Sequence, residues 1–416
     1  MKAVVLASSL ATFASCFANG AYLPMAPFLA SKSQVAVLLS AFGFTSCVIL
    51  VPAGLAVDRF GSKYVMKRGM WLFLLGLFLV SASSCFASQL LGRLISGAAG
   101  SIVFNAGMAM IIEDFQEPER SEYIGMFLGI GNIGNLVGPP LAGYTYILAK
   151  AADFPQPQAP PFIFAFVLVL LGCVVLERTD DKITSCSVPL LEPATADGGG
   201  RGSLCHRIFG VYSAVGVKSW VLAATLTGVW GAASALLCGG AVDMHLHGFS
   251  AIEIGAITVP ASIMQAVVSP WSGRMAGKPH VRAALITLSP LILSAVLACS
   301  ALMCFYKPDA VLLPVALALA GSSAAMAAVD APSISLMADL AVLHGRGYGE
   351  AVTASELAVT AGQALGPSFG LLMLRQGLGP LCLALAACTL LVSAASFACL
   401  QHKQQDSSAR GSLCRA

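Results

Sequence analysis

Charged residues are scarce in this sequence, and their scarcity excludes most soluble folds. Asp, Glu, Lys and Arg make up 10% of the 416 residues, and 57% are hydrophobic. A soluble domain carries about 25% charged residues. A chain of this length with so few polar groups cannot cover a water-facing surface, so its solvent must be lipid. Its net charge of +3 is also too small to indicate a nucleic-acid partner.

The motifs of ATP-driven pumps and metal sites are missing as well. No GxxxxGK[ST] phosphate loop occurs. The 13 cysteines form no CxxC pair and are scattered through apolar runs, as buried thiols are. The six histidines fall in loops. Their one near-pair, His245 and His247 after Asp243, is not expected to bind zinc. We therefore expect no metal and no enzymatic activity.

Long apolar runs predict membrane-spanning helices. About 20 apolar residues span a bilayer core of about 30 Å, and this length gives twelve candidates: 3–30, 35–57, 70–87, 89–112, 123–147, 160–176, 219–241, 251–271, 281–304, 310–337, 349–374 and 379–400. Residues 1–30 also fit a cleaved signal peptide, which would leave eleven spans. The stretch 177–218 is polar and glycine-rich, so it predicts a flexible cytoplasmic linker between an N-terminal bundle, 1–176, and a C-terminal bundle, 219–416.

The distribution of basic residues predicts the orientation. With both termini in the cytoplasm, eighteen of the 23 Lys and Arg residues fall inside and four outside, with Arg93 left within a span. A bias of this size is typical of cytoplasmic loops. The sequence thus predicts a multi-pass protein of the plasma membrane or of an intracellular vesicle or organelle.

The two halves repeat each other. Gly134-x3-Gly138-Pro139 in the fifth span returns as Gly362-x3-Gly366-Pro367 in the eleventh, 228 residues later. The loop after span two, Gly54 to Lys63, has a weaker copy after span eight, Gly273 to Lys278. Such correspondences at equivalent helices favour a duplicated six-helix unit.

Three stretches carry a family resemblance. Gly54, Asp58, Arg59, Gly61 and Lys63 resemble the signature loop of the major facilitator superfamily at every key position, and Arg93-x3-Gly97 resembles its second motif. Gly125, Gly134, Gly138, Pro139, Ala142 and Gly143 match the motif of its antiporters. The resemblance implies an all-α membrane fold of twelve helices in two pseudo-twofold-related bundles.

Within that superfamily, the C-terminal half looks most like the vesicular amine transporters of solute carrier family 18, a branch of the drug:H+ antiporters. Tyr348–Gly349, Glu356, Gly366–Ser368, Pro260–Ser262 and Val329–Asp330 carry this likeness. Several of the branch's acids are missing. The position of the branch's span-one acid is occupied by Ser15, and that of its span-seven acid lies within 236–239, which is uncharged. Its span-ten acid would lie near Ala341, with Asp339 as a stand-in. These departures argue against a monoamine substrate.

The small-residue motifs predict moving parts. Small residues let membrane helices pack closely, and proline permits a kink. We expect the GxxxGP stretches to form a moving seam between the bundles, with a static packing motif as the alternative. The resemblance implies that they favour exchange over leak. Asp58 is expected to cap a neighbouring helix near Gly349 and hold the cytoplasmic side shut, although a plain solvated turn is the alternative.

Ionisable groups inside spans predict the transport site, since a buried charge costs about 2.5–3.5 kcal/mol. These groups are Arg93, Asp330 and Glu356, and Glu356 shares a helix stripe with Gln363 and Pro367. The acids could carry protons, or one could be a structural partner of Arg93. A weaker set of cavity-lining candidates is Asn19, Tyr22, Trp230, Gln265 and Gln363.

These features predict a secondary transporter, a proton-coupled antiporter of a small organic solute such as an amine, polyamine or drug-like cation, working by alternating access. Its partners would be the lipid bilayer, the solute and H+, with the proton gradient in place of a cofactor and the chain a monomer. A uniporter or symporter of a neutral or anionic metabolite stays open, as do a polytopic membrane enzyme and a sensor that does not transport.

Overall fold

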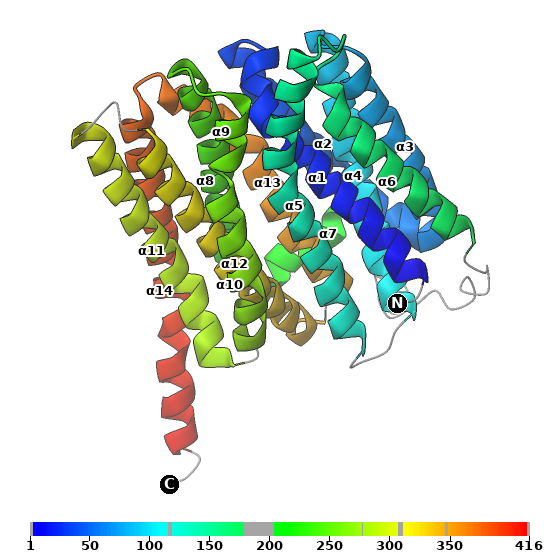
Figure 1. Ribbon diagram of the computed structural model, residues 1–416. Helices are drawn as coiled ribbons and strands as arrows, with labels where there is room; N and C mark the ends of the chain where they lie inside the picture. Colours follow the sequence, from blue (N-terminus) through cyan, green and yellow to red (C-terminus); the bar gives the residue numbers. More distant parts are fainter. Residues whose placement is uncertain are drawn as a thin grey trace.

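The chain is entirely helical in the computed structural model, which describes residues 3–114, 119–178, 204–276, 278–306, 311–345 and 348–413 (Figure 1). These residues form fourteen α-helices, which confirms the predicted all-α class. The first seven are α1 (Ala3–Leu29), α2 (Lys32–Phe60), α3 (Ser62–Ala82), α4 (Phe86–Asp114), α5 (Glu119–Ala151), α6 (Ala159–Glu177) and α7 (Leu204–Val215). The others are α8 (Val217–Leu246), α9 (Ala251–Ala256), α10 (Val259–Ala276), α11 (Pro279–Tyr306), α12 (Leu312–Leu343), α13 (Tyr348–Leu374) and α14 (Leu378–Leu413).

All twelve predicted intervals overlap helices, and two departures concern which segments are helical. The eighth span is divided into α9 and α10, because Pro260 in the first turn of α10 has no N–H to bond back and its ring excludes the carbonyl four residues earlier. The predicted flexible linker contains α7, so residues 204–215 are helical rather than irregular. Ten segments of the described chain are long and apolar enough to cross a membrane; α1 and α5 are not among them.

The helices form two halves, each containing most of one buried core. One core joins large side chains of α1, α3, α4 and α6, among them Phe17, Phe73, Met110 and Phe162. The other joins α8, α11, α12 and α14, with Val229, Leu297, Leu319 and Leu381. Figure 1 shows these halves side by side, with α1 beginning and α14 ending on the same side of the molecule, called the terminal side below.

In the N-terminal half, the first GxxxG pair lies against α1. A Cβ atom at Gly134 would lie 2.5 Å from the Phe13 carbonyl oxygen, and one at Gly138 would lie 2.6 Å from that of Phe17. Only glycine allows the two backbones to approach so closely.

The C-terminal half repeats this arrangement. A Cβ atom at Gly362 on α13 would lie 2.7 Å from the Thr227 carbonyl oxygen of α8, and one at Gly366 would lie 2.6 Å from that of Gly231. The repeated sequence therefore makes the same helix–helix contact twice. The paired glycines therefore hold helices together within a half. Other residues of the same two stretches, Pro139 and Gln363, lie at the contact between the halves, where the seam was predicted.

Two of the contacts between the halves are made by α2 with α13 and by α5 with α9. On α2 and α13, the Ser40 and Ser368 hydroxyls are 3.1 Å apart, and Gly43 lies against Gln363. On α5 and α9, Gly143 lies against the backbone of Ala251.

A Cβ at Gly255 of α9 would lie 2.5 Å from the Pro139 carbonyl oxygen of α5. Pro139 and Gly143, at the end of the antiporter motif, thus form the part of that motif that touches the opposite half.

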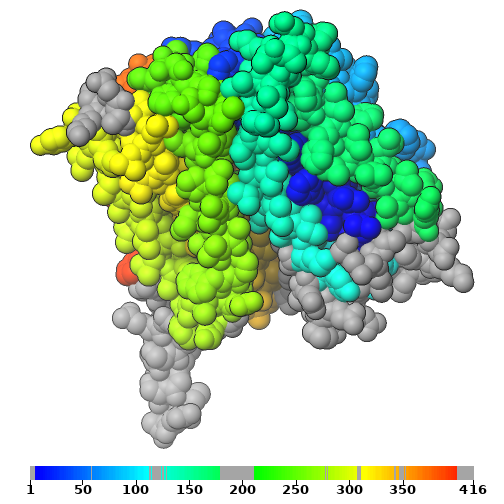
Figure 2. All heavy atoms as spheres, in the orientation of Figure 1, coloured from blue at the N-terminus to red at the C-terminus, as the bar shows by residue number. Residues whose placement is uncertain are grey.

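The contact between α5 and α9 lies on the side away from the termini (Figure 1). Towards the terminal side the surface is hollowed between α5 and α10, and more distant atoms of the C-terminal half are visible there (Figure 2). In this structure the halves are therefore closed at one end and separated at the other along this pair of helices.

Candidate transport site

Two carboxyl groups lie inside the C-terminal half, within the apolar length of its helices. Asp330 belongs to α12 and Glu356 to α13, and both side chains are partly buried. Asp330 follows a stretch of mostly small residues, 320–328, which allows α12 to pack closely beside α8 and α13. The structure therefore brings together the two acids that the sequence singled out, and they are close enough to interact electrostatically.

Trp230 orients one of these acids. Its indole Nε1 donates a hydrogen bond of 2.8 Å to Oδ1 of Asp330. A tryptophan N–H is a donor only, so it stabilises a carboxylate oxygen without neutralising its charge. Trp230 was a predicted cavity residue, and its position beside Asp330 makes it part of the same site.

Glu356 has no such partner. Among the described residues, no side chain donates a hydrogen bond to its carboxyl group or forms an ion pair with it. Its backbone carbonyl accepts a hydrogen bond of 2.9 Å from the Thr360 hydroxyl. An acid without a fixed cation inside a membrane protein must be neutralised by a proton or by a bound cation, since its bare charge costs about 2.5–3.5 kcal/mol.

Arg93 on α4 lies in the other half and is not the partner of either acid. Its Nε donates to the Leu38 carbonyl at 3.2 Å, and its guanidinium stacks 4.7 Å and 4.8 Å from the ring centres of Tyr22 and Phe42. Its side chain also donates to Asn19 at 2.9 Å, and the residue is 3% exposed. Hydrogen bonds and ring faces thus hold this cation, and it links α4 to α1 and α2.

The weaker cavity predictions have mixed outcomes. Asn19 accepts a hydrogen bond from Arg93, and Tyr22 is fully buried beneath it, so Tyr22 cannot touch a solute in this conformation. Gln265 on α10 and Gln363 on α13 are partly buried, and Gln363 lies at the contact with Gly43. Their roles in binding stay predictions. Sequence reasoning missed Phe42, because nothing in its apolar run distinguishes a ring that covers an arginine.

Pro367 is the last residue of the predicted stripe on α13, and it is more buried than Glu356. It is buried, as is the neighbouring Gly366 that packs on α8, whereas Glu356 is partly exposed. The prolines of both stretches lie within unbroken helices, Pro139 in α5 and Pro367 in α13.

The signature loop makes a sharp turn between α2 and α3. Gly61 has a φ of +84°, donates its N–H to the Val57 carbonyl at 2.9 Å, and separates the two helices. Side chains disfavour this conformation, which explains the glycine. Arg59 lies 5.4 Å from the Phe60 ring centre, and Lys63 is mostly buried.

No side chain lies within 4 Å of a Cβ built at Gly54. The Asp58 side chain is outside the described part, so its predicted cap near Gly349 stays a prediction. Of Gly125, only its place in α5 is described.

Two further sequence candidates have other roles in the structure. Asp339, considered as a stand-in for a missing acid, pairs with Arg282 at 2.6 Å and is largely exposed. His247 contacts Asp243, with 3.7 Å between Nδ1 and Oδ2, while the His245 ring packs edge-on against Phe28 of the other half at 4.4 Å. The near-pair of histidines therefore points to different partners.

The sequence between residues 8 and 367 matches the family model of the Major Facilitator Superfamily. The chain belongs to this superfamily. It is therefore a transporter with many membrane-spanning helices and not an enzyme. Over its full length the fold resembles that of a bacterial homolog of the human lysosomal transporter Spinster, crystallised in an inward-facing and unoccupied conformation, with a TM-score of 0.70, 14% identity and 97% of both chains covered.

Two curated relatives resemble part of this superfamily member. The quinolone resistance protein NorA of Staphylococcus aureus is 26% identical over 164 residues, which is 39% of this chain and 40% of NorA. The riboflavin transporter RibZ of Clostridioides difficile is 25% identical over 166 residues, 39% of this chain and 36% of RibZ. The match thus spans about two fifths of the length of these relatives.

Proposed function

We propose that this transporter is a proton-coupled antiporter of a small organic cation, such as an amine, a polyamine or a drug-like molecule. The observation that carries the proposal is the pair Asp330 and Glu356, held near each other inside the C-terminal half. Within the described residues neither acid has a basic partner, since Arg93 is engaged in the other half. Either protons or a cationic solute would neutralise the pair, but not both at once.

This competition is the physical basis of exchange. With the halves separated on the terminal side, a solute entering between α5 and α10 would approach the acids and displace their protons. The loaded protein could then close on the terminal side and open between α5 and α9. A bare acid pair would pay the cost of unpaired charge inside the membrane, so the empty, deprotonated protein would change conformation slowly and leak would be suppressed.

The terminal side is proposed to face the cytoplasm, because the basic residues concentrate there. The membrane would be the plasma membrane or that of a vesicle or organelle, and the chain would act as a monomer with H+ and solute as its only exchanged partners. The likeness to the vesicular amine branch and the partial match to NorA support a cationic or drug-like solute.

A second candidate is a uniporter or symporter of a neutral or anionic metabolite. The partial match to RibZ favours it, as does the absence of an acid at Ser15 and at 236–239, where the amine branch has one.

One experiment separates the two candidates. Purified protein is screened by thermal shift against amines, polyamines, drug-like cations, sugars and riboflavin, and each stabilising compound is tested for exchange in proteoliposomes. The antiporter account predicts that cations stabilise the protein and that their uptake needs a proton gradient. If only neutral or anionic compounds stabilise it, and they cross without proton movement, the second candidate is correct.

A further inference from the structure

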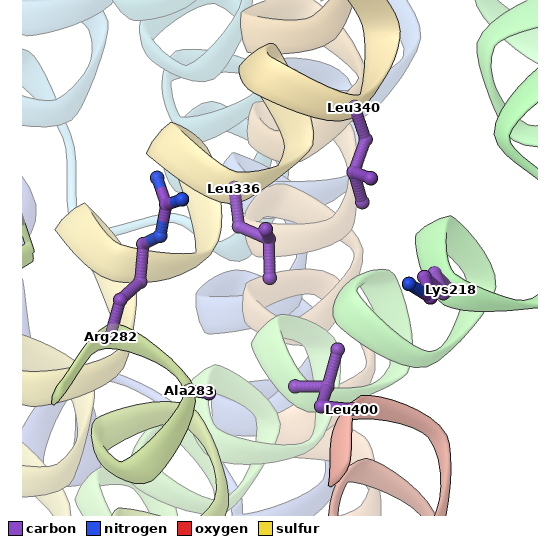
Figure 3. A pocket seen from close by; sticks show the side chains of 6 residues that line it. All are labelled: Lys218, Arg282, Ala283, Leu336, Leu340 and Leu400. Atoms are coloured by element: carbon purple, nitrogen blue, oxygen red, sulfur yellow. The ribbon is translucent and has the colours of Figure 1, made fainter. Parts of the chain in front are cut away.

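A small cavity opens at the terminal end of the C-terminal half, away from the two acids. It has a volume of about 130 Å³ and is lined by side chains of four helices: Lys218 of α8, Arg282 and Ala283 of α11, Leu336 and Leu340 of α12, and Leu400 of α14 (Figure 3). A single water needs roughly 10–15 Å³ of such space, so the cavity admits a polar group of several atoms.

The cavity lies at the depth where membrane spans end. The apolar segments that contribute to it are Val217–Leu246, His280–Tyr306, Leu312–Ala341 and Leu378–Leu400. Lys218 and Arg282 fall within the first residues of their segments, and Leu340 and Leu400 at the last residues of theirs. This depth corresponds to the boundary between acyl chains and headgroups in a bilayer.

The charges at this boundary favour an anion. Asp339 forms an ion pair with Arg282 at 2.6 Å and offsets its positive charge. Lys218 is partly buried and, among the residues that the structure describes, forms no hydrogen bond or ion pair. The N-termini of α8 and α11 add partial positive charge, and the cap residue of α8, Gly216, has no side chain to satisfy the first N–H groups. The cavity therefore holds an excess of positive charge.

The remaining wall is apolar. Leu336 and Leu340 lie one turn apart on α12, and Leu400 faces the cavity from α14 (Figure 3). An inorganic anion gains nothing from three half-buried leucines, whereas a phospholipid can place its phosphate on the basic residues and its acyl chain along the leucines. From these features we infer that the cavity binds the phosphate of an anionic phospholipid from the leaflet on the terminal side.

The inference is tested on the full-length chain, purified and delipidated, by native mass spectrometry with two lipids of identical acyl chains. The wild-type protein should bind phosphatidylglycerol several-fold more tightly than phosphatidylcholine. The Lys218→Gln variant should bind phosphatidylglycerol about fivefold more weakly than wild type, since one basic residue contributes about 1 kcal/mol to anionic lipid binding. Its affinity for phosphatidylcholine should not change.

Arg274→Gln is the matched control, because it removes an exposed positive charge from α10 near the same side without touching the cavity. Equal affinity of the wild type for both lipids, or equal weakening by both substitutions, would overturn the inference. A third arm uses inorganic phosphate: if phosphate alone raises the melting temperature as much as phosphatidylglycerol vesicles do, the ligand is a soluble anion and the lipid assignment is wrong.

Discussion

The contact between α5 and α9 offers a direct way to move the conformational equilibrium, through Gly255→Ala. The new methyl group would lie 2.5 Å from the Pro139 carbonyl oxygen and 3.1 Å from the Pro140 Cα, and both are backbone atoms that cannot turn away. Overpacking of this kind costs about 1–3 kcal/mol. The cost applies only while the halves are closed between α5 and α9. The substitution should therefore shift the population about 5- to 150-fold towards the conformation that is open between these two helices.

Hydrogen–deuterium exchange followed by mass spectrometry measures this shift. Peptides covering α9 and the end of α5 near Gly143 should exchange faster in Gly255→Ala than in wild type, while peptides of the GxxxG contact between α1 and α5 should not change. The control is Gly129→Ala, which has the same glycine-to-alanine change in α5 with nothing within 4 Å of the new Cβ. Unchanged exchange at α9, or an equal increase in the control, would refute the assignment of this contact as the moving one.

Three further variants test the other parts of the account. Glu356→Gln should abolish proton-coupled uptake in proteoliposomes while leaving the melting temperature close to wild type, because the amide keeps the size of the side chain but cannot carry the proton; wild-type exchange by this variant would remove Glu356 from the mechanism. Trp230→Phe should lower uptake about fivefold or more, since Asp330 loses a hydrogen bond in a site where such a loss costs about 1–3 kcal/mol; unaltered uptake would show that the bond has no role. Gly61→Ala should destabilise the protein by about 1–3 kcal/mol, seen as a lower melting temperature, because its backbone conformation is nearly restricted to glycine; an unchanged melting temperature would contradict the turn geometry.

The helices and the repeat could be predicted from the sequence because lipid imposes a simple rule. Each spanning helix needs about 20 apolar residues, and the intervals found by this length overlap every described helix except α7. The repeated Gly-x3-Gly-Pro marked α5 and α13 correctly as equivalent helices. The break before α10 and the helix α7 were missed, since a proline in an apolar run is compatible with either a kink or an end, and a short helix in a polar linker carries no hydropathy signal.

The partners of site residues were harder to predict than the residues themselves. Asp330 and Glu356 stood out because charge inside a span is costly, and the structure places them near each other. The sequence left open an ion pair with Arg93, but hydrogen bonds and two ring faces satisfy this cation locally.

The GxxxGP stretches reach the contact between the halves through Pro139 and Gln363, whereas their paired glycines pack within a half. A small-residue motif shows that some backbone lies close, but it does not show which one.

The central claim is that the acid pair exchanges protons for an organic cation. Its most direct test is the pH inside proteoliposomes, read with a trapped pH-sensitive dye, while a cation identified by thermal shift flows out down its own gradient. The account predicts that the lumen of vesicles with wild-type protein acidifies as protons enter in exchange, and that vesicles with Glu356→Gln show no change. Outflow of the cation with a constant internal pH in the wild type would contradict the account.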